Sequence, residues 1–170
     1  RWVWSKGATV CATWLERVGE RGGGGLDVRW TGDLGVDAHH TGEEVGIALG
    51  EACAEALGDK AGVRRFANAR VPLDEALVDV ALDLSGRPYL HHEVDFPGQK
   101  ILGDPPYDPP LMEEFWRAFA MPARITVHLT LVRGKNTHHI VEATFKGRAR
   151  ALSDAVRIDG EGVPSTKGSL

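Results

Sequence analysis

Cysteine is scarce in this chain of 170 residues, which contains only Cys11 and Cys53. Two cysteines are too few for a disulfide-stabilised scaffold or a cysteine-based metal cluster. No apolar run approaches the roughly 18 to 20 residues that a membrane helix needs, and no segment at the start resembles a signal peptide. The net charge of −4 gives no reason to expect a basic surface for nucleic acid. We therefore expect a cytoplasmic protein that binds neither nucleic acid nor a membrane.

The sequence nevertheless has enough apolar residues, 42%, to build the core of a single domain spanning residues 1–170. Helical and strand patterns alternate along it. Apolar spacing predicts helices near residues 10–18, 39–57, 111–120 and 138–156. Alternation of apolar and polar residues predicts strands near 26–30, 77–84 and 125–131, and the turn at 85–88 leads into a further strand.

The two halves of the chain share one order of elements: helix, strand, turn, and a helix that opens with paired histidines. The motif is His-His-x-x-Glu, and its copies begin at His39 and His138. Both histidines and the glutamate of the second copy lie 99 residues after their counterparts in the first. This pattern predicts two structural repeats, at about residues 1–70 and 71–160, in an α+β fold with antiparallel sheets covered by helices.

The repeated motif suits a metal ion. Residues three and four apart lie on one face of a helix, so each glutamate can stand beside the histidines of its own motif. Two imidazoles and a carboxylate are ligands that manganese, iron and zinc accept. One alternative is a polar first turn whose glutamate favours the helix dipole, but two copies at matching positions argue against it. A di-iron oxidase would use Glu-x-x-His in a four-helix bundle, whereas the order here is reversed and strands separate the helices.

Further segments surround the two motifs in a fixed order. Residues 32–34 and 37–50 enclose the first motif, and Gly134-Lys135-Asn136-Thr137 leads into the second. Residues 64–66, 74–77 and 85–89 lie between them, and Pro164-Ser165-Thr166-Lys167-Gly168 follows. From about Leu26 to Leu170, these segments resemble the imidazoleglycerol-phosphate dehydratase family.

The resemblance implies a duplicated ββαββ-like (ferredoxin-like) fold. It also implies a homo-oligomer, a large hollow shell of about 24 subunits with metal sites between them. The implied reaction is the dehydration of imidazole glycerol phosphate to imidazole acetol phosphate in histidine biosynthesis, which makes the chain a hydro-lyase.

The resemblance also implies two Mn²⁺ ions per site, which act as Lewis acids towards the substrate's imidazole. Their expected ligands are the residues of both motifs: His39, His40, Glu43, His138, His139 and Glu142. Glu43 and Glu142 are the candidates for moving protons while the glycerol chain loses water. The substrate's phosphate needs cationic and hydroxyl donors, and the positions that match the family are Arg65, Arg87, Lys146, Ser165 and Lys167.

The sequence departs from the family at two metal positions. Thr13 stands where the family has a histidine ligand, and a hydroxyl is a poor substitute for imidazole. Glu114 replaces a second histidine, but a carboxylate can still bind manganese, so we include it among the expected ligands. The chain also begins too late to supply the family's opening strand and its glutamate. These departures leave an alternative, a catalytically impaired homologue that keeps the shell fold and partial metal binding.

The remaining histidines lie on predicted strands. His91 and His92 are neighbours, so they face opposite sides of a strand and cannot share a metal. We expect them to be structural or exposed to solvent. For His128 we expect a role in packing or in supporting a metal ligand, rather than in binding the metal itself.

Overall fold

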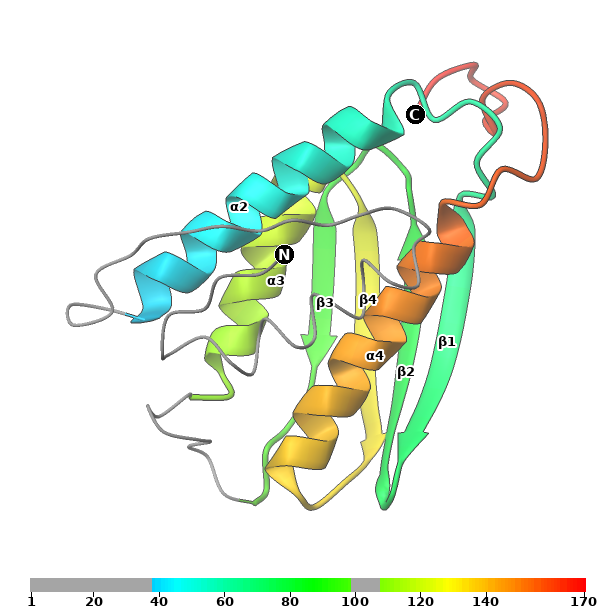
Figure 1. Cartoon of the computed structure of the whole chain (residues 1–170). Coiled ribbons are helices and arrows are strands. Elements are labelled where there is room, and N and C mark those ends of the chain that lie inside the picture. Colours follow the sequence, from blue (N-terminus) through cyan, green and yellow to red (C-terminus); the bar gives the residue numbers. More distant parts are fainter. Residues whose placement is uncertain (1–37, 99–107) are drawn as a thin grey trace, which may run out of the picture.

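The computed structural model describes residues 38–98 and 108–170, which form helices packed on one mixed sheet (Figure 1). The helices are α2 (Ala38–Leu57), α3 (Leu111–Ala123) and α4 (Thr137–Ala155). The strands are β1 (Phe66–Leu73), β2 (Ala76–Asp83), β3 (Tyr89–Glu93) and β4 (Thr126–Arg133). The predicted α+β class is confirmed. None of the helices described is long and apolar enough to cross a membrane.

The four strands lie in the order β1-β2-β4-β3. β1 and β2 pair antiparallel, as do β2 and β4, whereas β3 and β4 pair parallel. The parallel pair arises because α3 lies between β3 and β4 in the chain and returns it to the same end of the sheet. The expected antiparallel arrangement therefore holds for two of the three pairs.

The core lies between one face of the sheet and the helices. On β2, Val78, Val80 and Leu82 point inwards and are at most 6% exposed. α4 packs on β1 and β2, α3 packs beside β3, and α2 packs on α3 (Figure 1). The rings of Trp116 on α3 and Phe145 on α4 meet with centroids 5.1 Å apart, which joins these helices over the sheet.

Two glycines allow α2 to lie directly against α3. A Cβ on Gly46 would lie 2.7 Å from the carbonyl oxygen of Phe115, and one on Gly50 would lie 2.4 Å from that of Phe119. Any side chain at these positions would therefore push the helices apart. The Gly-Ile-Ala-Leu-Gly sequence thus sets the distance between α2 and α3.

Most predicted elements match the structure within a few residues. The helices predicted at 39–57, 111–120 and 138–156 are α2, α3 and α4, and the strands predicted at 77–84 and 125–131 are β2 and β4. β1 was not predicted, and the proposed repeat boundary at residue 70 falls inside it. Because β1 pairs with β2 along its whole length, it belongs with the second half. The helix and strand predicted at 10–18 and 26–30 lie outside the described residues.

Candidate active site

The second histidine motif opens α4, where a capped turn fixes its position. The side chain of Asn136 accepts hydrogen bonds from the backbone N–H groups of His138 (2.9 Å) and His139 (3.4 Å). Just before it, a Cβ on Gly134 would lie 2.7 Å from Cγ1 of Ile140. The cap and the close packing together set both histidines in the first turn of the helix.

Glu142 lies between a histidine and a lysine on one face of α4. Its Oε2 is 3.2 Å from Nε2 of His138, and its Oε1 is 2.6 Å from Nζ of Lys146. The hydrogen bond from Lys146 lowers the pKa of Glu142 below its ordinary value. The carboxylate is therefore ionised at neutral pH and offers a charged oxygen beside the imidazole of His138.

His139 faces a different carboxylate. Its Nδ1 is 2.7 Å from Oε2 of Glu75, and its Nε2 is 3.5 Å from Oδ2 of Asp74. Glu75 also accepts hydrogen bonds from backbone N–H groups of the turn before α4. The bond with His139 is the largest cause that lowers the pKa of Glu75 to about 2, and it raises the pKa of His139. The sequence patterns indicate no role for Glu75.

The first motif opens α2 at the equivalent place, since each helix begins one residue before the first histidine of its motif. His40 is exposed and Glu43 is half-buried. The side chain of His39 and the whole of Thr13 lie outside what the structure describes. Over residues 38–98 and 108–170, no group of three or more His, Cys, Asp or Glu side chains is arranged to hold a metal.

Glu114, the expected replacement ligand, is half-buried in the first turn of α3. Its neighbour Glu113 pairs with Arg117 and lies 3.7 Å from Nδ1 of His92. The side chain of His92 is only 3% exposed, whereas that of His91 is 43% exposed. The two strand histidines therefore face opposite sides, as predicted, and His128 lies on the outer face beside His91, with ring centroids 5.4 Å apart.

Four of the five predicted phosphate-binding residues line one pocket. It has a volume of about 610 Å³ and lies where the loops after α2 and β2 meet the last residues of the chain. Its walls contain Arg65, Arg87, Ser165 and Lys167 together with Pro164, Thr166, Ser169 and Leu170. Arginine and lysine charges, a serine hydroxyl and an open mouth suit a phosphate group.

Arg65 is held firmly in the wall of this pocket. Its Nε and Nη2 donate to the carboxylate of Asp83 at 2.7 and 3.3 Å, and its Nη1 donates to the carbonyl oxygen of Pro164 at 2.9 Å. Its backbone N–H donates to the carbonyl of Ala155, the last residue of α4. Arg87, by contrast, is 72% exposed, and its nearest carboxylate, on Asp83, is 4.0 Å away. Arg65 is thus a fixed part of the pocket wall, whereas the exposed guanidinium of Arg87 can donate hydrogen bonds to a bound phosphate.

The second motif lies in the first turn of α4, whereas the pocket lies beyond the other end of this helix, where the backbone N–H of Arg65 bonds to Ala155. His138 is the second residue of α4 and Ala155 is its last, so at 1.5 Å per residue they are roughly 26 Å apart. Lys146, the fifth predicted phosphate residue, is absent from the pocket and is paired with Glu142 instead. The first motif lies at the start of α2, whereas the pocket lies beyond the end of that helix. The length of α2 therefore keeps them apart in the same way. Within one chain, the structure therefore brings four phosphate residues together but keeps them away from both motifs.

Comparisons with known proteins match nearly the whole chain. The family model of imidazoleglycerol-phosphate dehydratase matches residues 7–152. The chain belongs to the imidazoleglycerol-phosphate dehydratase family. It is 53% identical over 158 residues to the dehydratase of Acidothermus cellulolyticus, covering 92% of this chain and 75% of the relative. The dehydratase of Acetivibrio thermocellus is 55% identical over 147 residues, with 85% of this chain and 74% of the relative covered.

Solved dehydratase structures share the fold. The Staphylococcus aureus enzyme superposes with a TM-score of 0.81 at 35% identity, covering 91% of this chain and 86% of the other. The Pyrococcus furiosus enzyme gives a TM-score of 0.80 at 37% identity, covering 95% of this chain and 86% of the other. The predicted family, the hydro-lyase class and the link to histidine biosynthesis are confirmed. The comparisons give no support to the catalytically impaired alternative.

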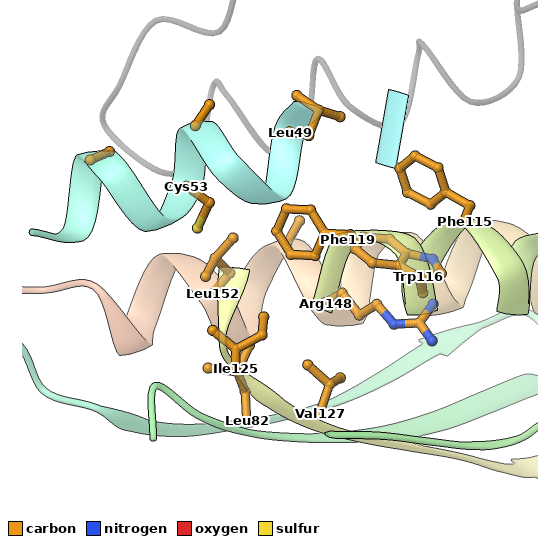
Figure 2. A pocket seen from close by; sticks show the side chains of 13 residues that line it. Leu49, Cys53, Leu82, Phe115, Trp116, Phe119, Ile125, Val127, Arg148 and Leu152 are labelled. Atoms are coloured by element: carbon orange, nitrogen blue, oxygen red, sulfur yellow. The ribbon is translucent and has the colours of Figure 1, made fainter. Parts of the chain in front are cut away.

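A second pocket in this dehydratase-family chain lies in its core and contains none of the predicted site residues (Figure 2). It measures about 310 Å³ and lies between the helices and the inner face of the sheet. Figure 2 shows Cys53 of α2 directed towards Leu152 of α4, with the ring of Phe119 nearby. The guanidinium carbon of Arg148 lies 4.3 Å from the centroid of the Trp116 ring. The lining of this core pocket is apolar apart from Cys53 and Arg148, and it contains no carboxylate or histidine that could move protons in a dehydration.

Proposed function

We propose that this chain dehydrates imidazole glycerol phosphate to imidazole acetol phosphate, using two Mn²⁺ ions bound by the paired histidines and glutamates of its two motifs. The observation that carries the proposal is the pocket in which Arg65, Arg87, Ser165 and Lys167 converge. It suits the phosphate end of the substrate, and the two motifs suit the metals that would bind its imidazole end. Family membership supplies the reaction.

The donors of the second motif fit a manganese ion. Manganese accepts imidazole nitrogen together with carboxylate oxygen, and the side chains of His138 and Glu142 lie 3.2 Å apart on one helix face. The hydrogen bond from Lys146 lowers the pKa of Glu142, which favours the ionised carboxylate that a ligand oxygen requires. When bound, the ions would supply Lewis acidity towards the substrate's imidazole ring. His40, Glu43, His139 and Glu114 complete the expected set, with His39 in α2.

The protein's own residues would bind the phosphate and move the protons. Arg87 and Lys167 offer exposed cationic donors, Ser165 offers a hydroxyl, and Arg65 is oriented by Asp83. Proton removal from the glycerol chain and proton delivery to the departing hydroxyl need a carboxylate within reach of the substrate. Glu43 and Glu142 are our candidates for that role.

The site we propose is shared between copies of the chain. An imidazole ring, three carbons and a phosphate extend over about 10 Å with bonds near 1.5 Å. The second motif and the phosphate pocket of one chain are separated by roughly 26 Å along α4. One substrate therefore needs the pocket of one copy and a motif of another. This favours the homo-oligomeric shell of about 24 subunits, in which Lys146 of one copy could reach a phosphate held by its neighbour. We place this biosynthetic enzyme in the cytoplasm.

The test is dehydration of imidazole glycerol phosphate by purified, manganese-loaded protein, with metal content measured on the same sample. We expect turnover that depends on manganese and disappears in His139→Ala, together with a particle far larger than a monomer by light scattering. Bound manganese without turnover would contradict the proposed reaction. Turnover by a monomeric protein would contradict the shared site.

A further inference from the structure

Glu75 lies in a tight hairpin turn close to His139 of the proposed metal site. Leu73 pairs with Ala76 across the β1–β2 hairpin, so Asp74 and Glu75 alone form its turn. Asp74 adopts a φ of 47°, in the left-handed region that two-residue turns use. The paired strands on either side fix the backbone from which the Glu75 side chain extends.

The two carboxylate oxygens of Glu75 contact different groups. Oε1 accepts hydrogen bonds from the backbone N–H groups of Lys135 (3.0 Å) and Asn136 (2.7 Å), which lie in the turn before α4. Oε2 is 2.7 Å from Nδ1 of His139, in the first turn of that helix. The carboxylate therefore joins the hairpin tip, the cap of α4 and the imidazole in one rigid arrangement.

This contact determines which nitrogen of the neutral His139 ring has a free lone pair. An ionised carboxylate only accepts hydrogen bonds, and Glu75 at 2.7 Å from Nδ1 is much closer than Asp74 at 3.5 Å from Nε2. The hydrogen of the neutral ring therefore resides on Nδ1 and the lone pair on Nε2. A metal ion needs that lone pair, and its histidine ligands commonly hold the other nitrogen against a carboxylate. His138 faces another carboxylate, with its Nε2 3.2 Å from Oε2 of Glu142.

We infer that Glu75 is a positioning residue, which orients the His139 ring and directs its Nε2 lone pair towards the metal. The inference rests on the proposed role of His139 as a manganese ligand. It assigns to the β1–β2 hairpin a part in building the metal site, although Glu75 itself need not touch the metal or the substrate.

The variant Glu75→Gln separates this role from a purely structural one. Glutamine keeps an oxygen that can accept from Lys135 and Asn136, so the turn before α4 stays in place. Its amide nitrogen, however, donates a hydrogen bond to Nδ1 of His139. The ring hydrogen is then forced onto Nε2, where it blocks the lone pair that the metal needs. Asp79→Asn is the matched control, since it removes one negative charge from the same hairpin at a side chain that pairs with Arg70 and not with His139 in the described residues.

The experiment is a titration of the assembled protein with Mn²⁺ alone, followed by electron paramagnetic resonance of the free ion, with a urea unfolding curve for each variant. We expect Glu75→Gln to weaken manganese binding by about 10- to 100-fold. Asp79→Asn should bind like the wild type, and both variants should unfold at similar urea concentrations. In a His139→Ala background, Glu75→Gln should cause no further loss, because its effect acts through that ring.

Three results would overturn the inference. One is equal manganese affinity in the wild type and Glu75→Gln, and another is an undiminished effect of Glu75→Gln in the His139→Ala background. The third is an affinity loss accompanied by a clear loss of stability relative to Asp79→Asn, which would make the role structural. A wild-type protein that binds no manganese would overturn the metal proposal as well, so the two failures can be told apart.

Discussion

Replacing Arg87 by Ala should weaken substrate binding while leaving the fold intact. The side chain is 72% exposed and its nearest carboxylate is 4.0 Å away, so little in the folded chain depends on it. We expect the free energy of unfolding to change by no more than about 0.5 kcal/mol. A hydrogen bond from a charged donor to phosphate contributes about 1.5 to 3 kcal/mol. Its loss corresponds to a rise in KM of about 10- to 150-fold.

Steady-state kinetics over a range of substrate concentrations would measure this effect, with inorganic phosphate as a competing ligand. Arg87 binds a part of the substrate that does not react, so KM should rise while kcat stays within a few-fold of the wild type. Inhibition by phosphate should weaken in parallel. Arg70→Ala is the matched control, because Arg70 is 67% exposed on β1 and pairs with Asp79 outside the pocket.

Three outcomes would refute the reasoning from the pocket. If KM and phosphate inhibition were unchanged in Arg87→Ala, the pocket would not be the phosphate site. If Arg70→Ala raised KM to the same extent, the effect would reflect the general charge of the protein. A fall in kcat with KM unchanged would place Arg87 in the chemical step instead.

Further substitutions test other parts of the structure. His139→Ala should lower turnover at fixed manganese by at least about 100-fold, and undiminished turnover would remove it from the metal site. Burial, followed by the charge of Arg148, lowers the pKa of His92 to about 3. The unfolded chain takes up this proton near pH 6.5, so stability should fall as the pH drops from about 6.5 towards 3, by at most about 1.4 kcal/mol per pH unit. Urea curves of His92→Leu should show a smaller acid loss, and an unchanged loss would contradict this assignment. Gly50→Ala should destabilise the protein by about 1 to 3 kcal/mol because its Cβ meets α3, whereas Gly42→Ala, whose Cβ meets nothing, should gain up to about 1 kcal/mol. Equal unfolding midpoints for these two variants would contradict the packing argument.

The sequence was sufficient to predict elements with a strong apolar period. α2, α3 and α4 repeat apolar residues at helical spacing, and β2 and β4 alternate clearly, so their positions were predicted to within a few residues. β1 was missed because its inward positions include the small residues Ala67 and Ala69, while Phe66 is 59% exposed. Hydrophobic alternation is weak in such a strand, and only its pairing with β2 defines it.

The candidate site was predictable only in part. The phosphate residues are scattered between residues 65 and 167, so no local pattern joins them, and resemblance to the family was needed to select them. Helical spacing correctly placed Lys146 on the face of α4 that carries the second motif. In the structure, however, Lys146 forms an ion pair with Glu142, one turn away, and does not line the phosphate pocket. Glu75 falls in a segment that resembles the family, but no local pattern indicates its partners, which lie about 60 residues further along the chain. Its role follows from hairpin geometry that the sequence pattern does not contain.

The length of α4 has a genetic consequence. If each site combines the phosphate pocket of one copy with a histidine motif of another, then defects in the two parts belong to different copies. An allele carrying Arg87→Ala and an allele carrying His139→Ala would each spoil every site when expressed alone. Expressed together in one cell, they would assemble mixed particles in which some sites receive both intact parts. Two alleles that cannot support growth without histidine should therefore complement each other, although they encode the same protein.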